Sequence, residues 1–252
     1  MSFDVAAEAY DAFMGRFSAP LAERFADWAR LPRDGRALDV GCGTGALLSV
    51  LARRFGETEV AGVDPSASFV EAAASRLPWA DVRHGTAEAL PFDDDLFAAT
   101  LAQLVMHFMT DAAAGAREMV RVTRPGGVVA ACVWDLENAR APHAVFLRAA
   151  TAETGAPAPP LRAGTRRGDL VQLLEDAGCH DVSETELTVE SEFASFDEWW
   201  ESTNIRVGVA ASVLEGLDAD GVERVRTRTR ELWGDGSFTV TGTAWAARGI
   251  AP

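Results

Sequence analysis

The chain has 252 residues, a length at which a single α/β domain with a large core is common. Its 38 acidic and 23 basic residues give a net charge of −15, which leaves little electrostatic basis for holding a phosphate backbone or an anionic membrane surface. Composition therefore argues against nucleic acid and membrane partners and favours a small-molecule ligand.

The lysine and cysteine content excludes several kinds of catalytic and structural site. All of the basic residues are arginine, so no internal lysine is present to form a Schiff base. Cys42, Cys132 and Cys179 lie far apart without the spacing of metal ligands, which predicts neither a disulfide framework nor a metal site. With no basic leader and no apolar run of about 18 residues, we expect a cytoplasmic protein.

Residues 3–31 are expected to be helical. Apolar residues recur at spacings of three and four, which is the pattern of a helix that packs one face on a core. We expect Pro20 to open the second of two helices, because proline is tolerated in the first helical turn. The apolar positions are Phe13, Phe17, Leu21, Phe25 and Trp28.

A glycine-rich turn follows a short strand. Residues 37–40 form an apolar run broken only by Asp39, and residues 46–52 have the composition of a helix packed on a sheet. Between them, the glycines at 41, 43 and 45 allow unusual backbone dihedrals and let a ligand approach the N–H groups closely. This strand, turn and helix predict a nucleotide-binding site.

Asp39 separates two kinds of nucleotide. The pattern Gly-x-Gly-x-x-Ala of residues 41–46, with Asp64 downstream, also fits a loose dinucleotide fingerprint. A pyrophosphate ~5 Å from the Asp39 carboxylate would be repelled by ~3 kcal/mol at an effective dielectric of ~20. A ligand with a cationic end reverses that sign.

Residues 39–45, Asp-x-Gly-x-Gly-x-Gly, resemble motif I of the class I S-adenosylmethionine (SAM)-dependent methyltransferases, of the type found in ubiquinone and menaquinone biosynthesis. SAM carries a sulfonium and an α-ammonium group, which suit a neighbouring carboxylate. The resemblance implies that this turn binds the cofactor through Asp39, Gly41, Cys42, Gly43 and Gly45.

The second predicted strand, residues 59–64, ends in Asp64. The Ser-x-x-Glu pattern of residues 68–71 predicts a capping box for the next helix, which leaves residues 64–66 as the bend. A carboxylate at this bend has acceptors for both hydroxyls of a ribose. We expect ribose and adenine to lie against Asp64, Pro65, Ser66 and Phe69, with a core position as the alternative for Phe69.

A third strand is expected over residues 81–85. The loop after it resembles the family's loop beside adenine, which implies that Thr86, Ala87 and Glu88 line the cofactor site. The family often carries aspartate where this chain has Thr86, so the backbone N–H of Ala87 is the expected contact to a ring nitrogen. The three aspartates at 93–95 are interpreted as a solvated turn rather than a metal site.

The fourth strand, residues 96–102, leads into residues whose position at the carboxyl end of an open α/β sheet favours ligand contact. Gln103 is expected near the methionine part of SAM. His107 matches a histidine frequent in the family after this strand, and it is the histidine best placed to take a proton near neutral pH. It is the candidate catalytic residue, with a packed structural histidine as the alternative.

A helix over residues 111–122, an Arg-Pro-Gly-Gly stop and a fifth strand over residues 128–134 extend the resemblance, which spans residues 10–134. The segment at 10–17 resembles the N-terminal cover of some of these methyltransferases. The resemblance implies that Tyr10, Met14 and Arg16 reach the cofactor, with Arg16 pairing with its carboxylate.

Beyond Trp134 the resemblance is weaker. Residues 156–160 are interpreted as a semi-rigid connector. A helix face ending at Gly178 and strands over residues 182–189 and 238–244 fit the family's last elements, the final strand antiparallel. The helices between these strands are expected to cover the substrate pocket, with weak candidates for its lining in Phe196, Trp199, Trp200 and Trp233.

The resemblance implies one Rossmann-like domain over residues 1–252, with a seven-stranded, mostly parallel sheet and helices on both faces. Within it we expect a helical cover (1–35), a SAM-binding core (36–135) and a helical insertion (190–235). The expected reaction moves the SAM methyl group to an oxygen, nitrogen or carbon of a small molecule and leaves S-adenosylhomocysteine (SAH). The alternatives are a non-catalytic SAM-binding protein, an NAD(P)-dependent oxidoreductase, or other chemistry on SAM; the acceptor and oligomeric state are not predicted.

Overall fold

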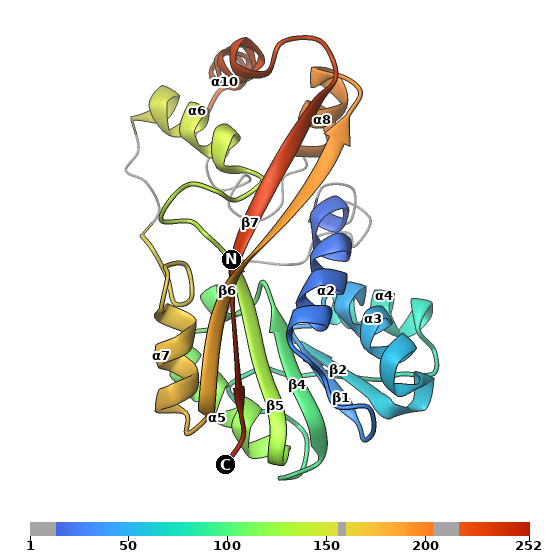
Figure 1. The fold of residues 1–252 in the computed structure, drawn as a ribbon. Coiled ribbons are helices and arrows are strands. Elements are labelled where there is room, and N and C mark those ends of the chain that lie inside the picture. The colour runs from blue at the N-terminus through green and yellow to red at the C-terminus, as the bar shows by residue number, and fades with distance from the viewer. Residues whose placement is uncertain (1–13, 156–159, 204–216) are drawn as a thin grey trace.

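The computed structural model describes residues 14–155, 160–203 and 217–252, and a seven-stranded sheet forms its centre (Figure 1). The strand order is β3-β2-β1-β4-β5-β7-β6; pairing is parallel from β3 to β5, and β7 is antiparallel to both β5 and β6. This confirms the expected fold. The strands are β1 (Ala37–Val40), β2 (Val60–Asp64), β3 (Asp81–His84), β4 (Phe97–Gln103), β5 (Thr123–Trp134), β6 (His180–Phe193) and β7 (Phe238–Ile250).

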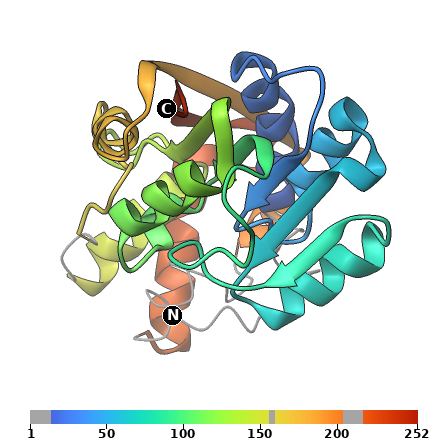
Figure 2. The same ribbon diagram turned by 90° about the horizontal axis from the view of Figure 1, so that it is seen from below.

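Helices cover both faces of the sheet. In Figures 1 and 2, α2, α3 and α4 lie on one side, and α5 and α7 lie on the other. Short 3-10 turns, η2 (Glu57–Glu59) and η3 (Met106–Phe108), precede β2 and follow β4. The helices are α2 (Arg16–Trp28), α3 (Ala46–Phe55), α4 (Ala67–Arg76), α5 (Ala112–Val122), α6 (Ala144–Thr154), α7 (Asp169–Asp176), α8 (Phe196–Thr203) and α10 (Ala219–Trp233).

Two hydrophobic clusters hold these layers together. On the α2 and α3 side, Phe17 and Leu51 are fully buried in one cluster; on the other side, Met119 of α5 and Leu170 of α7 belong to a second. All residues of β1, β2 and β4 are buried, as expected for parallel strands covered on both faces. The apolar faces predicted for these helices are therefore the faces that pack on the sheet.

The strand order places a crevice beside β1. Strands β2 and β3 lie on one side of β1, and strands β4 and β5 lie on its other side. The direction of winding therefore reverses between β1 and β4. Open α/β sheets bind ligands at such a point, outside the carboxyl ends of the strands. The glycine turn after β1 and the residues after Gln103 are therefore neighbours.

The hairpin of β6 and β7 extends beyond the rest of the sheet. Strand β5 pairs with β7 from Ala244 to Ile250, whereas β6 pairs with β7 up to Phe238. The extended part of the hairpin carries α8 and α10, and α10 packs against α6 (Figure 1). Both strands are longer than the ranges 182–189 and 238–244 expected from the sequence. The two strands continue to pair with each other beyond the residues that show an alternating polar and apolar pattern.

Three local expectations were wrong. Pro20 lies inside α2 rather than at the start of a helix; its missing N–H affects only the first helical residue, Arg16. The cap of α4 is Ser66, not Ser68: Asp64 Oδ1 accepts the Ser66 N–H at 2.8 Å, which turns the chain earlier. The Arg-Pro-Gly-Gly stop lies within β5 as an irregularity in its pairing with β4.

Candidate functional site

The glycine turn is fixed to the end of β2 by backbone hydrogen bonds. The N–H groups of Gly41 and Cys42 donate to the carbonyl of Val63 at 2.7 and 3.0 Å. The Gly43 N–H donates to Asp64 Oδ2 at 2.9 Å. The conformation of the turn is therefore set by the neighbouring strand before any ligand is bound.

The glycines of the turn are required for different reasons. Gly41 has a φ of +71°, and a Cβ there would lie 2.4 Å from the Val105 side chain. Gly45, at φ +94°, ends the turn as the residue before α3, and a Cβ there would lie 2.8 Å from Leu77. Gly43 has a φ of +52°, but a Cβ there would meet no atom within 4 Å. Space is therefore open above Gly43 for a ligand to contact the backbone.

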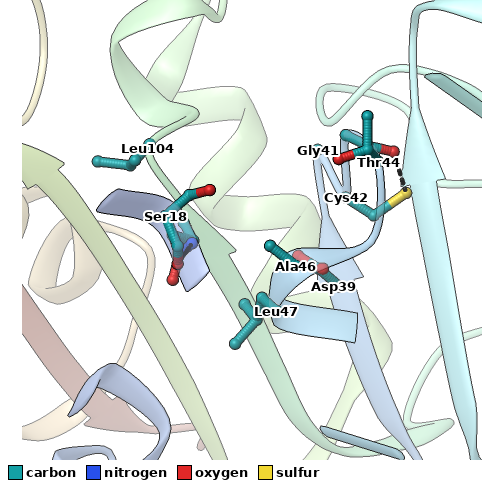
Figure 3. A pocket seen from close by; sticks show the side chains of 10 residues that line it. Ser18, Asp39, Gly41, Cys42, Thr44, Ala46, Leu47 and Leu104 are labelled. Atoms are coloured by element: carbon teal, nitrogen blue, oxygen red, sulfur yellow. Dashed lines mark hydrogen bonds between the residues drawn. The ribbon is translucent and has the colours of Figure 1, made fainter. Parts of the chain in front are cut away.

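A pocket of about 40 Å³ lies between this turn, α2 and the end of β4 (Figure 3). That space holds a small polar group rather than a whole nucleoside. The pocket brings together five predicted residues, Asp39, Gly41, Cys42, Gly43 and Gln103. Its other lining residues are Ser18, Thr44, Ala46, Leu47 and Leu104.

Asp39 is the most unusual group of this pocket. The residue is 1% exposed, and its carboxylate oxygens form no close hydrogen bond within the described part of the chain; the Leu48 N–H at the start of α3 acts on the carboxylate only weakly. Burial, and then the charge of Asp64, raises the pKa of Asp39 to about 8. A buried carboxylate without a donor is costly, so this pocket favours a cationic or hydrogen-bond-donating ligand.

Gln103 adds an acceptor to the same pocket. Its Nε2 donates to the carbonyl of Ser18 in α2 at 2.9 Å, while its Oε1 is buried and has no partner among the described residues. Together with the two oxygens of Asp39, the pocket wall presents three unpartnered acceptors. A primary ammonium group has three N–H donors and a positive charge, which matches this set.

Asp64 holds the bend at the end of β2. Its Oδ2 accepts from Gly43 and its Oδ1 from Ser66, and burial raises the pKa of this carboxyl group. The carbonyl of Pro65 lies 3.0 Å from Nε2 of His84, at the end of the adjacent strand. The bend predicted to contact a ribose is therefore rigid and lies directly beside the glycine turn.

The residues predicted to surround adenine are more dispersed. Phe69 is buried in the first turn of α4, and Ala87 is buried in the cluster on the α5 side. Thr86 is exposed. Glu88 accepts a hydrogen bond from the Thr110 N–H at 2.8 Å, so its side chain supports the segment before α5.

The N-terminal residues divide into three cases. Tyr10 lies outside the described residues. Met14 packs against the hydrophobic cluster on the α2 side. Arg16 pairs with Glu198 of α8, with Nη2 and Oε1 2.5 Å apart, and its guanidinium lies 4.6 Å from the centre of the Phe193 ring. The structure thus places Arg16 at the junction of α2 and α8, not in the pocket.

His107 lies in η3, just beyond the pocket. Its ring packs on Phe108 with 3.9 Å between ring centres, and its Nδ1 is buried without a partner in the described residues. Burial, and then the positive charges of His143 and Arg162, lowers the pKa of His107 to about 3. The imidazole is therefore neutral at neutral pH.

The aromatic residues of the insertion form a core rather than a wall of this pocket. Trp199 is fully buried, and Phe196 and Trp200 are nearly so. Trp233 is partly buried and stacks on Phe238 with 4.7 Å between ring centres. None of the four candidates lines the pocket beside Asp39.

Sequence reasoning missed Ser18 and Leu104. Leu104 has a φ of +61°, held by an N–H that donates to the carbonyl of Cys132 at 2.7 Å. Positive φ is rare for a bulky residue and is found at functional sites, yet no local pattern predicts it. Ser18 reaches the pocket because Gln103 binds its carbonyl, a contact across 85 positions of the chain.

Among the residues that the structure describes, no three histidine, cysteine, aspartate or glutamate side chains gather as they would around a metal ion. In the same residues, no helix has the length and apolar content needed to cross a membrane.

Comparison with known proteins adds sequence evidence. A family model described as a methyltransferase domain matches residues 38–131. The trans-aconitate 2-methyltransferase of Methylobacterium radiotolerans is 30% identical over 220 residues, which cover 84% of this chain and 78% of the relative. The malonyl-acyl-carrier-protein O-methyltransferase of Halorhodospira halophila is 34% identical over 165 residues, 61% of this chain and 52% of that protein. The chain spans about half the length of the first curated relatives it matches.

Solved structures show the same fold. The geranyl diphosphate C-methyltransferase of Streptomyces coelicolor, crystallised with Mg²⁺, geranyl diphosphate and SAH, superposes with a TM-score of 0.53. The two chains are 17% identical, and the match covers 93% of this chain and 80% of the other. At this identity the likeness concerns the fold alone.

Proposed function

Because the chain belongs to the family of class I SAM-dependent methyltransferases, we propose that it transfers the methyl group of SAM to an oxygen, nitrogen or carbon atom of a small molecule. One observation carries this proposal. Asp39 and Gln103 present unpartnered oxygens beside a glycine turn with open space above it. A relative named for trans-aconitate, a small organic acid, supports a small-molecule acceptor.

We assign the α-ammonium group of SAM to this pocket. When bound, SAM supplies a methyl group on a positively charged sulfur. Asp39 and Gln103 would accept the three N–H bonds of the α-ammonium group. The bound cation would lower the pKa of Asp39 from about 8, so that the ionised carboxylate attracts both cationic centres. The same carboxylate would repel the pyrophosphate of a dinucleotide, which argues against the oxidoreductase alternative.

The nucleoside end would lie over the turn and the end of β2. Both Asp64 oxygens already accept backbone hydrogen bonds, and each retains a lone pair for a ribose hydroxyl. Next to it we assign Cys42, Gly43 and Gly45 to the backbone wall of the site. The residues that we assign to the ribose and adenine are Asp64, Pro65, Ser66, Phe69, Thr86, Ala87 and Glu88.

The protein's part in the transfer is to align and desolvate the reactants. Such positioning can contribute ~7 to 11 kcal/mol to a bimolecular reaction. The helices α6, α8 and α10 stand beyond the carboxyl ends of the strands (Figure 1), and we assign them to the cover of the acceptor. We assign His107 to the acceptor side, where its neutral ring has one nitrogen to accept and one N–H to donate.

The test is a calorimetric titration with SAM, SAH and NADH. We expect SAM and SAH to bind and NADH not to bind. Asp39→Asn keeps the shape but removes the charge, and it should weaken SAM binding by about tenfold or more. Asp93→Asn, an exposed carboxyl outside the pocket, is the matched control and should bind like the wild type.

Two outcomes would contradict the proposal at different points. Binding of NADH without SAM would favour an oxidoreductase. Tight SAM binding with no SAH formed from any organic acid, amine or phenol acceptor would indicate a SAM-binding protein that is not an enzyme.

We also infer a cytoplasmic location. The three cysteines are free and buried, and burial raises the pKa of each thiol, so they are suited to a reducing compartment. The net charge of −15 supports a small-molecule partner rather than nucleic acid.

A further inference from the structure

The pocket beside the glycine turn brings together three acceptor oxygens that form no close hydrogen bond within the described residues. They are the two carboxylate oxygens of Asp39 and Oε1 of Gln103. Asp39 of β1 is the register partner of Leu101 in β4, two positions before Gln103, so the Asp39 and Gln103 side chains leave adjacent strands on the same face of the sheet. Gln103 Nε2 already binds the Ser18 carbonyl, which leaves the amide oxygen for the pocket.

The surroundings of Asp39 oppose a negative charge. The side chain is buried, and Asp64 at the end of β2 adds a second carboxylate beside it. Among the described residues that line the pocket, none is basic. The groups that face Asp39 from the other elements are the Leu48 N–H of α3, which acts on it weakly, the Cys42 and Cys132 thiols of the turn and β5, Ser18 of α2 and Gln103 of β4.

The free pocket is therefore neutral near pH 7. Burial, and then the Asp64 charge, places the pKa of Asp39 at about 8, so its carboxyl group carries a proton. A neutral carboxyl group avoids the cost of a buried, unpaired charge. Its O–H is also a donor, in a pocket wall that otherwise presents three acceptors without partners.

We propose that the α-ammonium group of SAM displaces the proton of Asp39, so that binding releases one proton and SAM affinity depends on pH. The proposal rests on the proposed function, which places this group in the same pocket. The O–H bond of Asp39 breaks, its proton passes to the buffer, and the ammonium group keeps its three N–H bonds. The charge in the pocket stays balanced throughout, because one cation replaces another.

Hydrogen bonding favours this exchange over binding to the neutral acid. Protonated Asp39 would direct an O–H donor into the space that the N–H donors of the ligand must occupy. Ionised Asp39 supplies two acceptors and a full negative charge, and Gln103 supplies the third acceptor. Attraction between the two charges is stronger here than in water, because the pocket is small and its walls are buried.

The exchange sets the direction of the pH dependence. Below pH 8 a growing fraction of free Asp39 holds the proton that SAM must displace, whereas an α-amino group, with an ordinary pKa of about 7.7 to 8.0, stays protonated. We therefore expect the dissociation constant of SAM to rise about tenfold from pH 7 to pH 6.

Calorimetry counts the proton directly. SAM is titrated into the protein at pH 6.5 in phosphate and in imidazole, two buffers whose protonation enthalpies differ widely. A proton released on binding is taken up by the buffer, so the observed heat differs between the buffers in proportion to the number released. We expect about one proton for each SAM bound.

Two controls identify the displaced proton. 5′-Methylthioadenosine lacks the amino-acid end of SAM, so it should bind the wild type with equal heats in both buffers. Asp39→Asn has no proton to release, so its weaker SAM binding should also give equal heats. Asp93→Asn, an exposed carboxyl group outside the pocket, should release the proton as the wild type does.

Each contrary result has a distinct meaning. Equal heats for SAM in the two buffers with the wild type would overturn the proposal, since no proton is then displaced. Proton release that persists in Asp39→Asn, or that accompanies 5′-methylthioadenosine, would overturn it by assigning the proton to another group. Absence of SAM binding by the wild type at pH 8 contradicts the proposed function instead.

Discussion

At the scale of single residues, Asp39 has the clearest physical signature. Its carboxyl group is buried, close to Asp64, and without a close hydrogen bond in the described residues. Such an arrangement destabilises the free protein and is retained where a ligand supplies the missing charge. The cost of Asp39 to the free protein should therefore be measurable as a dependence of stability on pH.

The direction of this pH dependence follows from the direction in which the pKa of Asp39 is shifted. The folded-state pKa of Asp39, about 8, lies above its ordinary value of 3.8, so the folded state holds the proton more tightly. Stabilisation by this proton is complete below about pH 4 and is lost as the pH rises to about 8, by about 1.4 kcal/mol per unit. Urea unfolding of Asp39→Asn should lack this slope.

The control for that measurement is Asp93→Asn, whose carboxyl group is exposed. Its free energy of unfolding should follow the pH profile of the wild type. Parallel profiles for the wild type and Asp39→Asn would show that the Asp39 pKa is not raised.

Some residues of the site were predictable and others were not. Asp39 and the glycines follow from a local pattern, and Gln103 follows from its place after a buried strand. Leu104 and Ser18 depend on backbone geometry and on a contact between distant segments. The expectation for Arg16 rested on a resemblance, and the structure gives its guanidinium a partner, Glu198, that no local pattern shows.

At the scale of elements, α2 links the cofactor pocket to the cover. Its first residue, Arg16, pairs with Glu198 of α8, and half a turn later the Ser18 carbonyl accepts from Gln103. Helix α2 therefore contacts the end of β4 and the helical cover at once. The ion pair at its start is partly exposed, so its contribution to stability is expected to be small.

Paired substitutions test whether Arg16 acts as this link. Arg16→Gln and Glu198→Gln each remove the ion pair, and glutamine at 198 can still accept the Ala194 N–H that Glu198 binds at 2.7 Å. Each should change the free energy of unfolding little, because the pair is solvent-exposed, and should leave SAM affinity within about twofold of wild type. Thermal unfolding and calorimetry measure both quantities.

A role for Arg16 at the cofactor carboxylate gives the opposite pattern. Arg16→Gln would then weaken SAM binding strongly, whereas Glu198→Gln would strengthen it by releasing the guanidinium. That result would show that Arg16 binds the cofactor as the sequence resemblance implies.

The boundaries of elements were less predictable than their existence. The Ser-x-x-Glu pattern at 68–71 satisfies the local rule for a cap, but the Asp64 side chain binds the Ser66 N–H and starts α4 earlier. The similar pattern at 195–198 is used: the Glu198 N–H donates to Ser195 Oγ at 3.2 Å. The difference lies in a competing side chain from the preceding strand, which a local rule does not include.

At the scale of the whole molecule, strand β7 has one region with a neighbouring strand on both sides and another with a neighbouring strand on one side. From Ala244 to Ile250, β7 lies between β5 and β6, whereas residues 238–242 of β7 pair with β6 alone. Amide hydrogen exchange should therefore be slower in the first region, by about tenfold or more, because opening there breaks contacts on both sides. Equal exchange rates in the two regions would contradict this division.

The architecture was predictable to the extent that it repeats a known pattern. Alternating buried strands and amphipathic helices over residues 36–134 predict a parallel sheet, and the strand order confirms it. The length of the β6–β7 hairpin and the packing of α10 on α6 were not predictable, because both depend on pairing between segments about fifty residues apart or more.

The extended hairpin also bears on how enzymes of this shape diversify. Within the described residues, the chain enters the extended part of the hairpin near Leu187, continues through α8 and α10, and returns to the nucleotide-binding half near Ala244. Recombination between relatives at these two points would exchange the α8 and α10 part of the acceptor cover, while α6 and the donor half are inherited intact. New substrate preferences can thus arise by swapping a module, without many coordinated point mutations.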